Sequence, residues 1–330
     1  MNNEFQNTRG QGGNPMPSEP AANAAISVEA ADYVDFDSVR TSRIRKILMY
    51  TGAKDRLIPQ LKELVNYAAH HFGLTHYKEL YGGSGALILN NDFPFNEYSY
   101  NERDEGVYSL MFALGDVRYV HSVIDQLKLS GVSESLFYEA KDALDSDENL
   151  TLVERAVYTY INIMQSFGAG RESFNSNLIR RPKEIEKYRK HIQELHSFYP
   201  FLSQVKITND DAADLLRSTI YDCSSLLFLD PPYHPDSGVS RENCYGNHSL
   251  SVGEHKELVD LLLQTRSKVI LSGYDNVDYR RLVENGWEKL FLGSIRVPVS
   301  SRGKLGDEYV WLNFEVPNNT LRADKPLVHW

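Results

Sequence analysis

Asp230-Pro-Pro-Tyr233 combines a carboxylate, two prolines and an aromatic ring directly after an apolar run at 224–229. The run predicts a buried strand, so the four residues would lie at the carboxyl edge of a sheet, where open α/β folds bind ligands. Pro231 and Pro232 fix the backbone and remove two N–H donors, so the turn presents carbonyl oxygens. Two acceptors beside an aromatic face suit a planar ring with an exocyclic NH2 group. Taken alone, such a turn also occurs in many proteins as a connection between two elements without any function.

A second turn, rich in glycine, precedes it in the chain. It consists of Tyr81, Gly82, Gly83, Ser84 and Gly85, between a short segment ending at Leu80 and a predicted helix start at 86–89. Glycines let the backbone turn tightly and let a ligand approach a helix N-terminus. Glu102 follows a predicted strand at 98–101 and suits the two hydroxyls of a ribose. Together they favour a nucleoside-type cofactor without identifying it; a plain turn and a surface glutamate are the alternatives.

The elements around these turns alternate between strands and helices. Helical spacing of apolar residues occurs at 57–71, 107–114, 152–164 and 255–265, and short strand-like runs occur at 224–229 and 268–272. Two further strands are expected around 295–299 and 309–316, joined by residues 300–306. The pattern predicts an open α/β sheet with helices on both faces and a terminal antiparallel hairpin. Residues 116–205 interrupt the alternation and are mostly helical, so they are the candidate second domain.

Composition narrows the class of protein. The 330 residues suggest about two domains. With 35 basic and 45 acidic residues the net charge is −10, which argues against a surface that is positive all over. Charge is segregated, however: residues 171–190 carry a net charge of +4, from seven bases and three acids, and residues 131–150 carry −5, from one base and six acids. Solvated helix faces would explain this equally well.

Several absences are also expected from the sequence. Two cysteines exclude a disulfide scaffold and a four-thiolate zinc site, and no metal site is expected. No apolar run reaches the length of about 18 residues that a membrane-spanning helix needs, so we expect a cytoplasmic protein without membrane contact. Residues 1–38 are rich in Asn, Gly, Ala and Pro and predict a disordered tail.

The two turns and their order resemble the Dam-type (D12 class) DNA adenine N6-methyltransferases, which use S-adenosylmethionine. Asp230-Pro-Pro-Tyr233 is identical to that family's catalytic tetrapeptide, and the turn at 81–85 resembles its F-x-G-x-G cofactor loop with Tyr for Phe. The segment at 50–54 resembles its first motif, with Ala53 where the family usually has glycine. Segments at 272–275 and 308–314 resemble later motifs. The resemblance covers about residues 44–316.

The resemblance implies a Rossmann-like class I methyltransferase sheet with an inserted, mostly helical DNA-recognition domain. The expected division is a tail at 1–38, a catalytic domain at 39–115 and 206–330, and a target-recognition domain at 116–205. Expected cofactor-binding residues are Tyr50, Lys54, Tyr81, Gly82, Gly83, Ser84, Gly85, Glu102, Asp210 and Asp230. The helix and hairpin expected to face double-stranded DNA lie at 155–175, followed by the basic run, and the expected DNA-binding residues are Phe167, Arg171, Phe174, Asn175, Arg180 and Arg181. For both phenylalanines, a place in the core is the stronger alternative.

The implied chemistry is direct transfer of a methyl group to the N6 amine of a flipped adenine. Hydrogen bonds from both amino hydrogens, to the Asp230 carboxylate and the Pro231 carbonyl, would free the nitrogen lone pair, and Tyr233 would stack on the ring. This chemistry requires neither a metal ion nor a covalent enzyme intermediate. Methylation of a cytosine ring carbon is disfavoured, because neither Cys223 nor Cys244 follows a proline.

Other functions stay open at this point. They are methylation of RNA adenine, of cytosine N4 or of a protein amide, a non-catalytic DNA-binding protein on a methyltransferase scaffold, and a nicotinamide dehydrogenase. The chain is expected to act as a monomer or weak dimer. Besides DNA, a cognate restriction endonuclease stays open as a second partner.

Overall fold

The fold is organised around one mixed β-sheet. The computed structural model describes residues 44–49, 54–90, 95–146, 149–237, 249–296 and 305–317, so the expected tail at 1–38 lies outside the described residues. Within these ranges seven strands form the sheet in the order β3-β2-β1-β4-β5-β7-β6. The strands are β1 (His76–Glu79), β2 (Glu97–Asn101), β3 (Val205–Thr208), β4 (Ser225–Leu229), β5 (Lys268–Tyr274), β6 (Glu288–Arg296) and β7 (Leu305–Leu312). β1 to β5 pair in parallel, whereas β7 pairs antiparallel with both β5 and β6.

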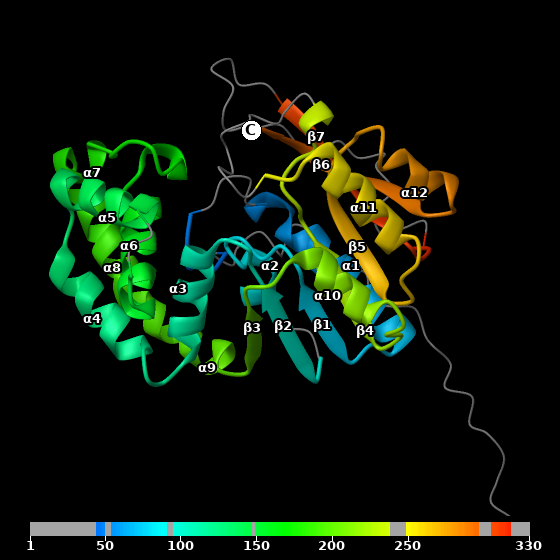
Figure 1. Ribbon diagram of the computed structural model, residues 1–330, viewed down its shortest axis with the longest axis horizontal. Helices are drawn as coiled ribbons and strands as arrows, with labels where there is room; N and C mark the ends of the chain where they lie inside the picture. Colours follow the sequence, from blue (N-terminus) through cyan, green and yellow to red (C-terminus); the bar gives the residue numbers. More distant parts are fainter. Residues whose placement is uncertain are drawn as a thin grey trace, which may run out of the picture. The chain divides into compact units, whose positions relative to one another are not determined.

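The central strand β4 shows why the sheet needs helices on both faces. All five of its residues are buried, as expected for a continuous apolar run in a parallel sheet. Leu226 and Phe228 lie in a core cluster with residues of α1 (Ile58–Phe72). Leu227 and Leu229 point to the other face, into a cluster with α10 (Ala212–Thr219), α11 (Val252–Leu262) and α12 (Arg280–Glu284). In Figure 1, α10 and α11 lie in front of the sheet and α1 lies behind it.

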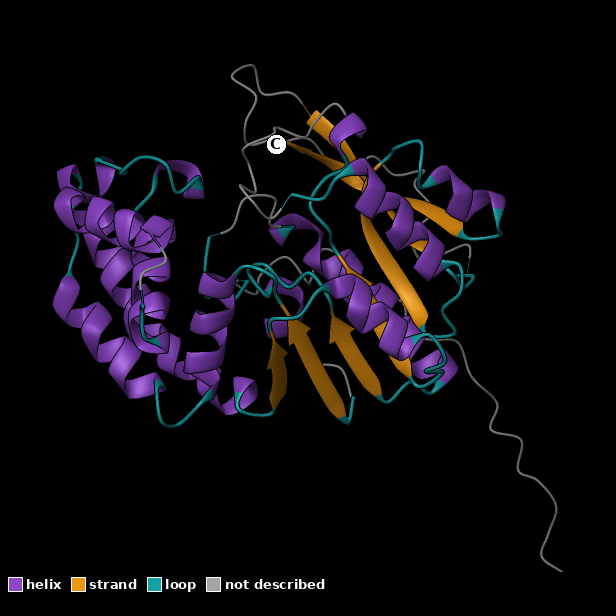
Figure 2. Cartoon of the chain, in the orientation of Figure 1, coloured by secondary structure: helices purple, strands orange, loops and turns teal. Residues whose placement is uncertain are grey.

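The helical segment between β2 and β3 forms a bundle of helices packed on one another (Figure 2). It follows α3 (Glu105–Gly115) and contains α4 (Val120–Ser130), α5 (Glu134–Ser146), α6 (Leu152–Met164), α7 (Asn177–Arg180), α8 (Pro182–Glu194) and α9 (Tyr199–Leu202). α6 begins with a capping box between Thr151 and Glu154. α3 and α6 pack so closely that only glycine fits at position 106, since a Cβ at Gly106 would lie only 2.3 Å from Thr159 Oγ1. The helical segment and the sheet together form a single compact unit.

These features confirm the predicted α/β sheet with helices on both faces and a terminal antiparallel hairpin. The first hairpin strand, however, begins at Glu288 rather than near Ile295. It contains a β-bulge between Phe291 and Gly293, which interrupts the strict alternation by which a strand is recognised in sequence. The DNA-facing hairpin expected near 165–175 is a tighter structure: a 3-10 turn, η3 (Phe167–Ala169), closed by one antiparallel bridge between Ser166 and Phe174. No described helix is both long and apolar enough to cross a bilayer.

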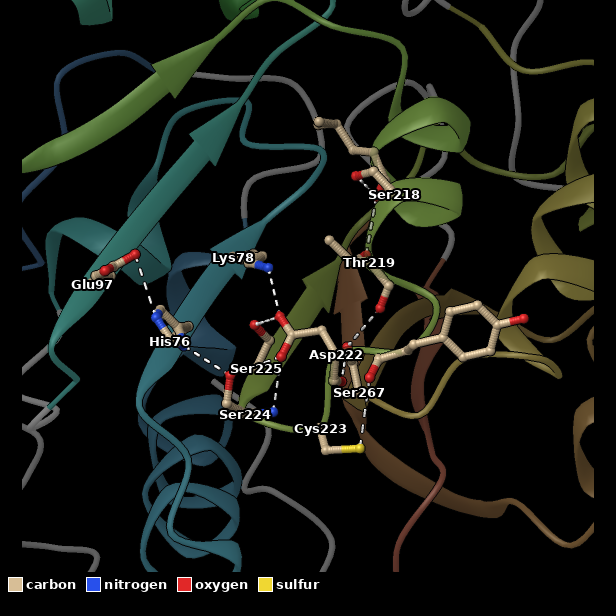
Figure 3. A network of polar contacts seen from close by, with 12 residues as sticks. His76, Lys78, Glu97, Ser218, Thr219, Asp222, Cys223, Ser224, Ser225 and Ser267 are labelled. Carbon is tan, nitrogen blue, oxygen red and sulfur yellow. Dashed lines mark hydrogen bonds and ion pairs between the residues drawn. The ribbon is translucent and has the colours of Figure 1, made fainter.

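A polar network fastens the amino ends of the central strands (Figure 3). The Asp222 carboxylate accepts hydrogen bonds from Lys78 Nζ at 2.8 Å, from Ser224 N at 2.9 Å and Oγ at 2.7 Å, and from Ser225 Oγ. Burial by itself would raise the pKa of Asp222, but the bonds from Lys78, Ser225 and Ser224 outweigh it and hold that pKa well below its usual range. The network therefore ties β1 to β4 at the edge opposite the two turns.

Replacing Asp222 by alanine should lower the free energy of unfolding by about 2–3 kcal/mol at pH 7, because Lys78 and both serines lose a charged acceptor. A depressed pKa contributes stability above the unfolded value of about 4, and this contribution is lost as the pH falls through the folded pKa. Urea unfolding at pH 7 and at pH 3 measures the effect. The difference between native chain and variant should shrink at pH 3; an equal difference at both pH values contradicts this account.

Candidate active site

The two turns of interest leave neighbouring strands at the same edge of the sheet. β1 and β4 pair in parallel with Glu79 opposite Phe228, and Leu80 N donates to Phe228 O at 3.0 Å. Because parallel strands end at the same edge, the glycine turn after β1 and Asp230-Pro-Pro-Tyr233 after β4 lie side by side. This is the arrangement that the sequence predicts.

Asp230 is held by a buried lysine that it shares with a second acid. Lys54 Nζ lies 2.7 Å from Asp230 Oδ1 and 3.6 Å from Glu308 Oε2. The Lys54 and Glu308 side chains are 3% and 0% exposed, whereas Asp230 is 24% exposed and reaches the surface of the site. Burial raises the pKa of Asp230 to about 6; Lys54 opposes this shift and Glu308 adds to it. The carboxylate at the site is thus ionised near neutral pH but easily protonated below it.

Tyr233 is fixed in orientation by the same group of residues. Its hydroxyl donates to Glu308 Oε1 at 3.3 Å, its ring lies 4.5 Å from the ring of Tyr274 in an edge-to-face arrangement, and Lys54 Nζ lies 5.1 Å from its ring centroid. Burial, then the nearby Glu308 and Asp230, raise the pKa of Tyr233 well above its usual range, so the phenol stays a neutral donor. A half-buried aromatic ring therefore stands in a set position beside the carboxylate.

The glycine turn requires at least two of its glycines. A Cβ at Gly82 would lie 2.0 Å from the ring of Tyr100, and the Tyr100 hydroxyl donates to Gly83 O at 2.7 Å. Gly83 and Gly85 have φ of +50° and +63°, in the left-handed region that favours glycine. Gly85 is the N-cap of α2 (Ala86–Leu89). The backbone of the turn is thus fixed before any ligand is present.

Glu102 braces this turn from the end of β2. Its Oε2 accepts from Gly83 N at 2.6 Å and its Oε1 accepts from Asp104 N at 2.9 Å. Burial raises the pKa of Glu102 to about 7, and the two backbone hydrogen bonds lower it only in part. A carboxylate has about four lone-pair sites, so two bonds leave room for a ligand's hydroxyls.

Asn101 cross-links three loops at this edge. Its amide donates to Leu80 O at 3.1 Å and to Asp210 O at 3.0 Å, and its Oδ1 accepts from Asp210 N at 2.9 Å. The Asp210 side chain is exposed. A cavity of about 280 Å³ adjoins these loops, and its wall includes Tyr81, Asn101 and Asp211. Asp211 rather than Asp210 thus faces the cavity.

The residues predicted to face DNA fall into three groups. Phe167 is 69% exposed on its turn, and Arg180 and Arg181 are exposed at the end of α7. Phe174 is buried against Phe137, with ring centroids 5.9 Å apart. It therefore lies in the core, which the sequence analysis gave as the alternative to a DNA contact. Two residues are engaged within the protein: Asn175 Oδ1 accepts from Asn177 N, and Arg171 pairs with Asp104.

A pair of buried histidines under the tetrapeptide has no counterpart in the sequence prediction. Asp236 N donates to His234 Nδ1 at 3.1 Å, so Nε2 carries the proton and donates to Asp278 Oδ2 at 2.9 Å. The ring of His255 lies 4.7 Å from that of His234. Burial, then His234, lower the pKa of His255 to about 4, which keeps it neutral. The cluster anchors the chain directly after Tyr233 to the loop after β5.

Sequence reasoning also missed the roles of Glu308, Tyr274 and Asn101, although the first two lie in segments that it singled out. Tyr50 lies outside the described residues. Across the described ranges, no three His, Cys, Asp or Glu side chains are grouped so that they could hold a metal ion.

Comparison with known proteins is decisive on the family. The sequence model of the D12 class N6 adenine-specific DNA methyltransferases matches residues 50–292, about three quarters of the chain, including both turns. A search of curated proteins finds no match.

The charge arrangement around Asp230 predicts opposite shifts for two substitutions. Glu308→Gln removes a neighbouring negative charge and should lower the pKa of Asp230, whereas Lys54→Met removes the paired cation and should raise it, each by about 1–2 pH units. Titration of the Asp230 carboxyl carbon by NMR, in protein labelled at aspartate, measures both, with the native midpoint near pH 6. Shifts in the same direction for both variants are incompatible with this assignment.

Proposed function

Because the chain belongs to the D12 class N6 adenine-specific DNA methyltransferase family, we propose that Asp230-Pro-Pro-Tyr233 holds the target adenine and that the glycine turn at 81–85 holds the methyl donor. The activity itself follows from the family: the chain is a site-specific DNA methyltransferase that acts on adenine. The family also decides against RNA, cytosine N4 and non-catalytic alternatives. The observation that carries the assignment of residues is the side-by-side exit of the two turns from β1 and β4.

The residues around the glycine turn fit S-adenosylmethionine, which supplies a methyl group activated on a sulfonium. The absence of a side chain at Gly82 lets the backbone of the turn pack directly on the Tyr100 ring, and Glu102 has lone pairs left for the ribose hydroxyls. The adjoining cavity of about 280 Å³ has apolar wall residues, Leu80 and Leu258, and the Tyr81 ring for a purine. Lys54 and Ser84 complete the proposed cofactor surroundings, together with Tyr50. Asp210 contributes through its backbone, which is hydrogen-bonded to Asn101 on the cavity wall.

Asp230 and the Pro231 carbonyl act on the adenine amine. The amine is a poor nucleophile because its lone pair is delocalised into the ring, and two accepted hydrogen bonds favour a pyramidal nitrogen with a free lone pair. Each acceptor stabilises the positive charge that develops on nitrogen, by about 3–4 kcal/mol for a preorganised group. Lys54 keeps Asp230 ionised and oriented at 2.7 Å. A carboxyl with a pKa of about 6 is also suited to take the proton that the methylated nitrogen releases and pass it to water.

Tyr233 receives the flipped base. Extruding a base from the duplex costs a few kcal/mol, which stacking on an aromatic face offsets in part. Tyr274 and Glu308 hold the ring of Tyr233 in place beforehand, so little side-chain entropy is lost on binding. Pro232 keeps the ring at a fixed distance from Asp230. Phe167, exposed on its turn, is the candidate to fill the gap that the flipped base leaves.

The DNA-contacting surface is proposed to lie on the recognition segment at 116–205, between the two parts of the catalytic domain at 39–115 and 206–330. Its support is the basic run at 171–190, in which Arg180 and Arg181 are exposed and free to meet phosphates. The chain is proposed to act on double-stranded DNA as a monomer or weak dimer, alone or beside a cognate restriction endonuclease.

Asp230→Ala should reduce the rate of methyl transfer at least about 100-fold, because the amine loses its charged acceptor, while DNA binding persists. Transfer of labelled methyl groups to unmethylated genomic DNA measures the rate, and a gel-shift titration measures binding. Asp260→Ala, an exposed acid of α11 that pairs with Arg281, is the matched control and should transfer at the native rate. Undiminished transfer by the Asp230 variant would refute the catalytic assignment.

Neutralising Arg180 and Arg181 together should lower the slope of log affinity against log salt concentration by about 2, since two phosphate contacts are lost. Fluorescence anisotropy with a labelled duplex at four salt concentrations measures the slope. The control is the pair Arg266→Ala and Lys268→Ala at the opposite edge of the sheet, which should leave it unaltered. An unaltered slope for the first pair places the DNA elsewhere.

A further inference from the structure

Arg171 belongs to the basic run of the recognition segment, but its side chain reaches the catalytic sheet edge. Its Nη1 lies 2.6 Å from Asp104 Oδ2, and the Asp104 side chain is only 6% exposed. Arg171 has a φ of +62°, which is uncommon for a residue with a side chain. Asn162 Nδ2, on α6, donates to Arg171 O at 3.1 Å and holds this backbone in place. The pairing is thus built into the turn after α6.

Asp104 links Arg171 to Glu102 and, through Glu102, to the glycine turn. Its carboxylate caps α3 by accepting from Val107 N at 3.0 Å, and its own N–H donates to Glu102 Oε1 at 2.9 Å. The other oxygen of Glu102 accepts from Gly83 N at 2.6 Å. A continuous series of short contacts therefore runs from the Arg171 guanidinium to the backbone of the glycine turn.

The charges along this series make Arg171 important for Glu102. The acids near Glu102 are Asp104 at the start of α3, which disfavours its ionised form, and Glu79 at the end of β1, whose own pKa is raised to about 8 by burial and, in smaller part, by Glu102. The pKa of Glu102 is raised to about 7 as the net result of burial and Asp104, which raise it, and of the two backbone hydrogen bonds and Arg171, which lower it. Without Arg171, burial and Asp104 would act on Glu102 with the backbone hydrogen bonds from Asp104 and Gly83 to oppose them.

We propose that Arg171, from the recognition segment, is a positioning residue of the cofactor site, where it holds Asp104 and Glu102 in the arrangement that binds the methyl donor. The cofactor site of the catalytic domain is then incomplete without the recognition segment. This inference rests on the proposed cofactor role of the glycine turn and Glu102. Arg171 would thus act on the cofactor site, whereas Arg180 and Arg181, which belong to the same basic run, would contact DNA.

Calorimetric titration of the full chain with S-adenosylmethionine, without DNA at pH 7, tests the proposal. Arg171→Ala should weaken binding about 10-fold, and Arg171→Lys, which keeps the charge, should recover most of the loss. Arg118→Ala is the matched control, since this exposed arginine also pairs with an aspartate, Asp116, and should bind as the native chain does. In a Glu102→Gln background, Arg171→Ala should have no further effect, because the group on which it acts is gone.

The pH dependence separates positioning from general damage to the fold. Losing Arg171 raises the pKa of Glu102, so the variant should regain affinity between pH 7 and pH 9 while the native chain changes little. Native affinity in Arg171→Ala, an equal loss in Arg118→Ala, or an equal loss at all pH values overturns the inference. Absence of binding by the native chain would instead overturn the proposed cofactor role, so the two failures are distinguishable.

Discussion

The parallel pairing of β1 with β4 is the constraint on which the rest of this structure depends. It places the exits of two strands that lie far apart in the sequence next to each other at one edge of the sheet. One exit has a backbone shaped by glycine and braced by Glu102, and the other has a carboxylate, carbonyl oxygens and an aromatic ring. The amino ends of the same two strands are joined by the Asp222 network, so the pair is fastened at both ends.

Buried charge is the second theme of the site. Lys54 is shared by Asp230 and Glu308, and two acids with one base leave a net negative charge in a poorly solvated place. Burying such a group costs stability unless it is paired, and this cost is typical of functional sites. The same arrangement orients Tyr233 and sets Asp230 at a pKa near the working range of a proton acceptor.

The sequence was sufficient for features that are contiguous in the chain. Both turns, the buried strand β4 and helix α6 follow from local residue types and spacing. Contacts between distant residues were out of reach: Glu308 meets Lys54 because β7 is inserted between β5 and β6, and this order cannot be read from periodicity. Likewise Arg171 looked like its basic neighbours, and only the direction of its side chain distinguishes it. The bulge in β6 concealed the start of the hairpin, because it breaks the alternation.

A crystal structure of the chain with S-adenosylhomocysteine and a duplex that contains the target adenine tests the central claim most directly. We expect the cofactor sulfur beside the turn at 81–85 and the flipped adenine stacked on Tyr233, with its N6 donating hydrogen bonds to Asp230 and the Pro231 carbonyl. A cofactor bound away from that turn, or an adenine amine that contacts neither acceptor, would contradict the account.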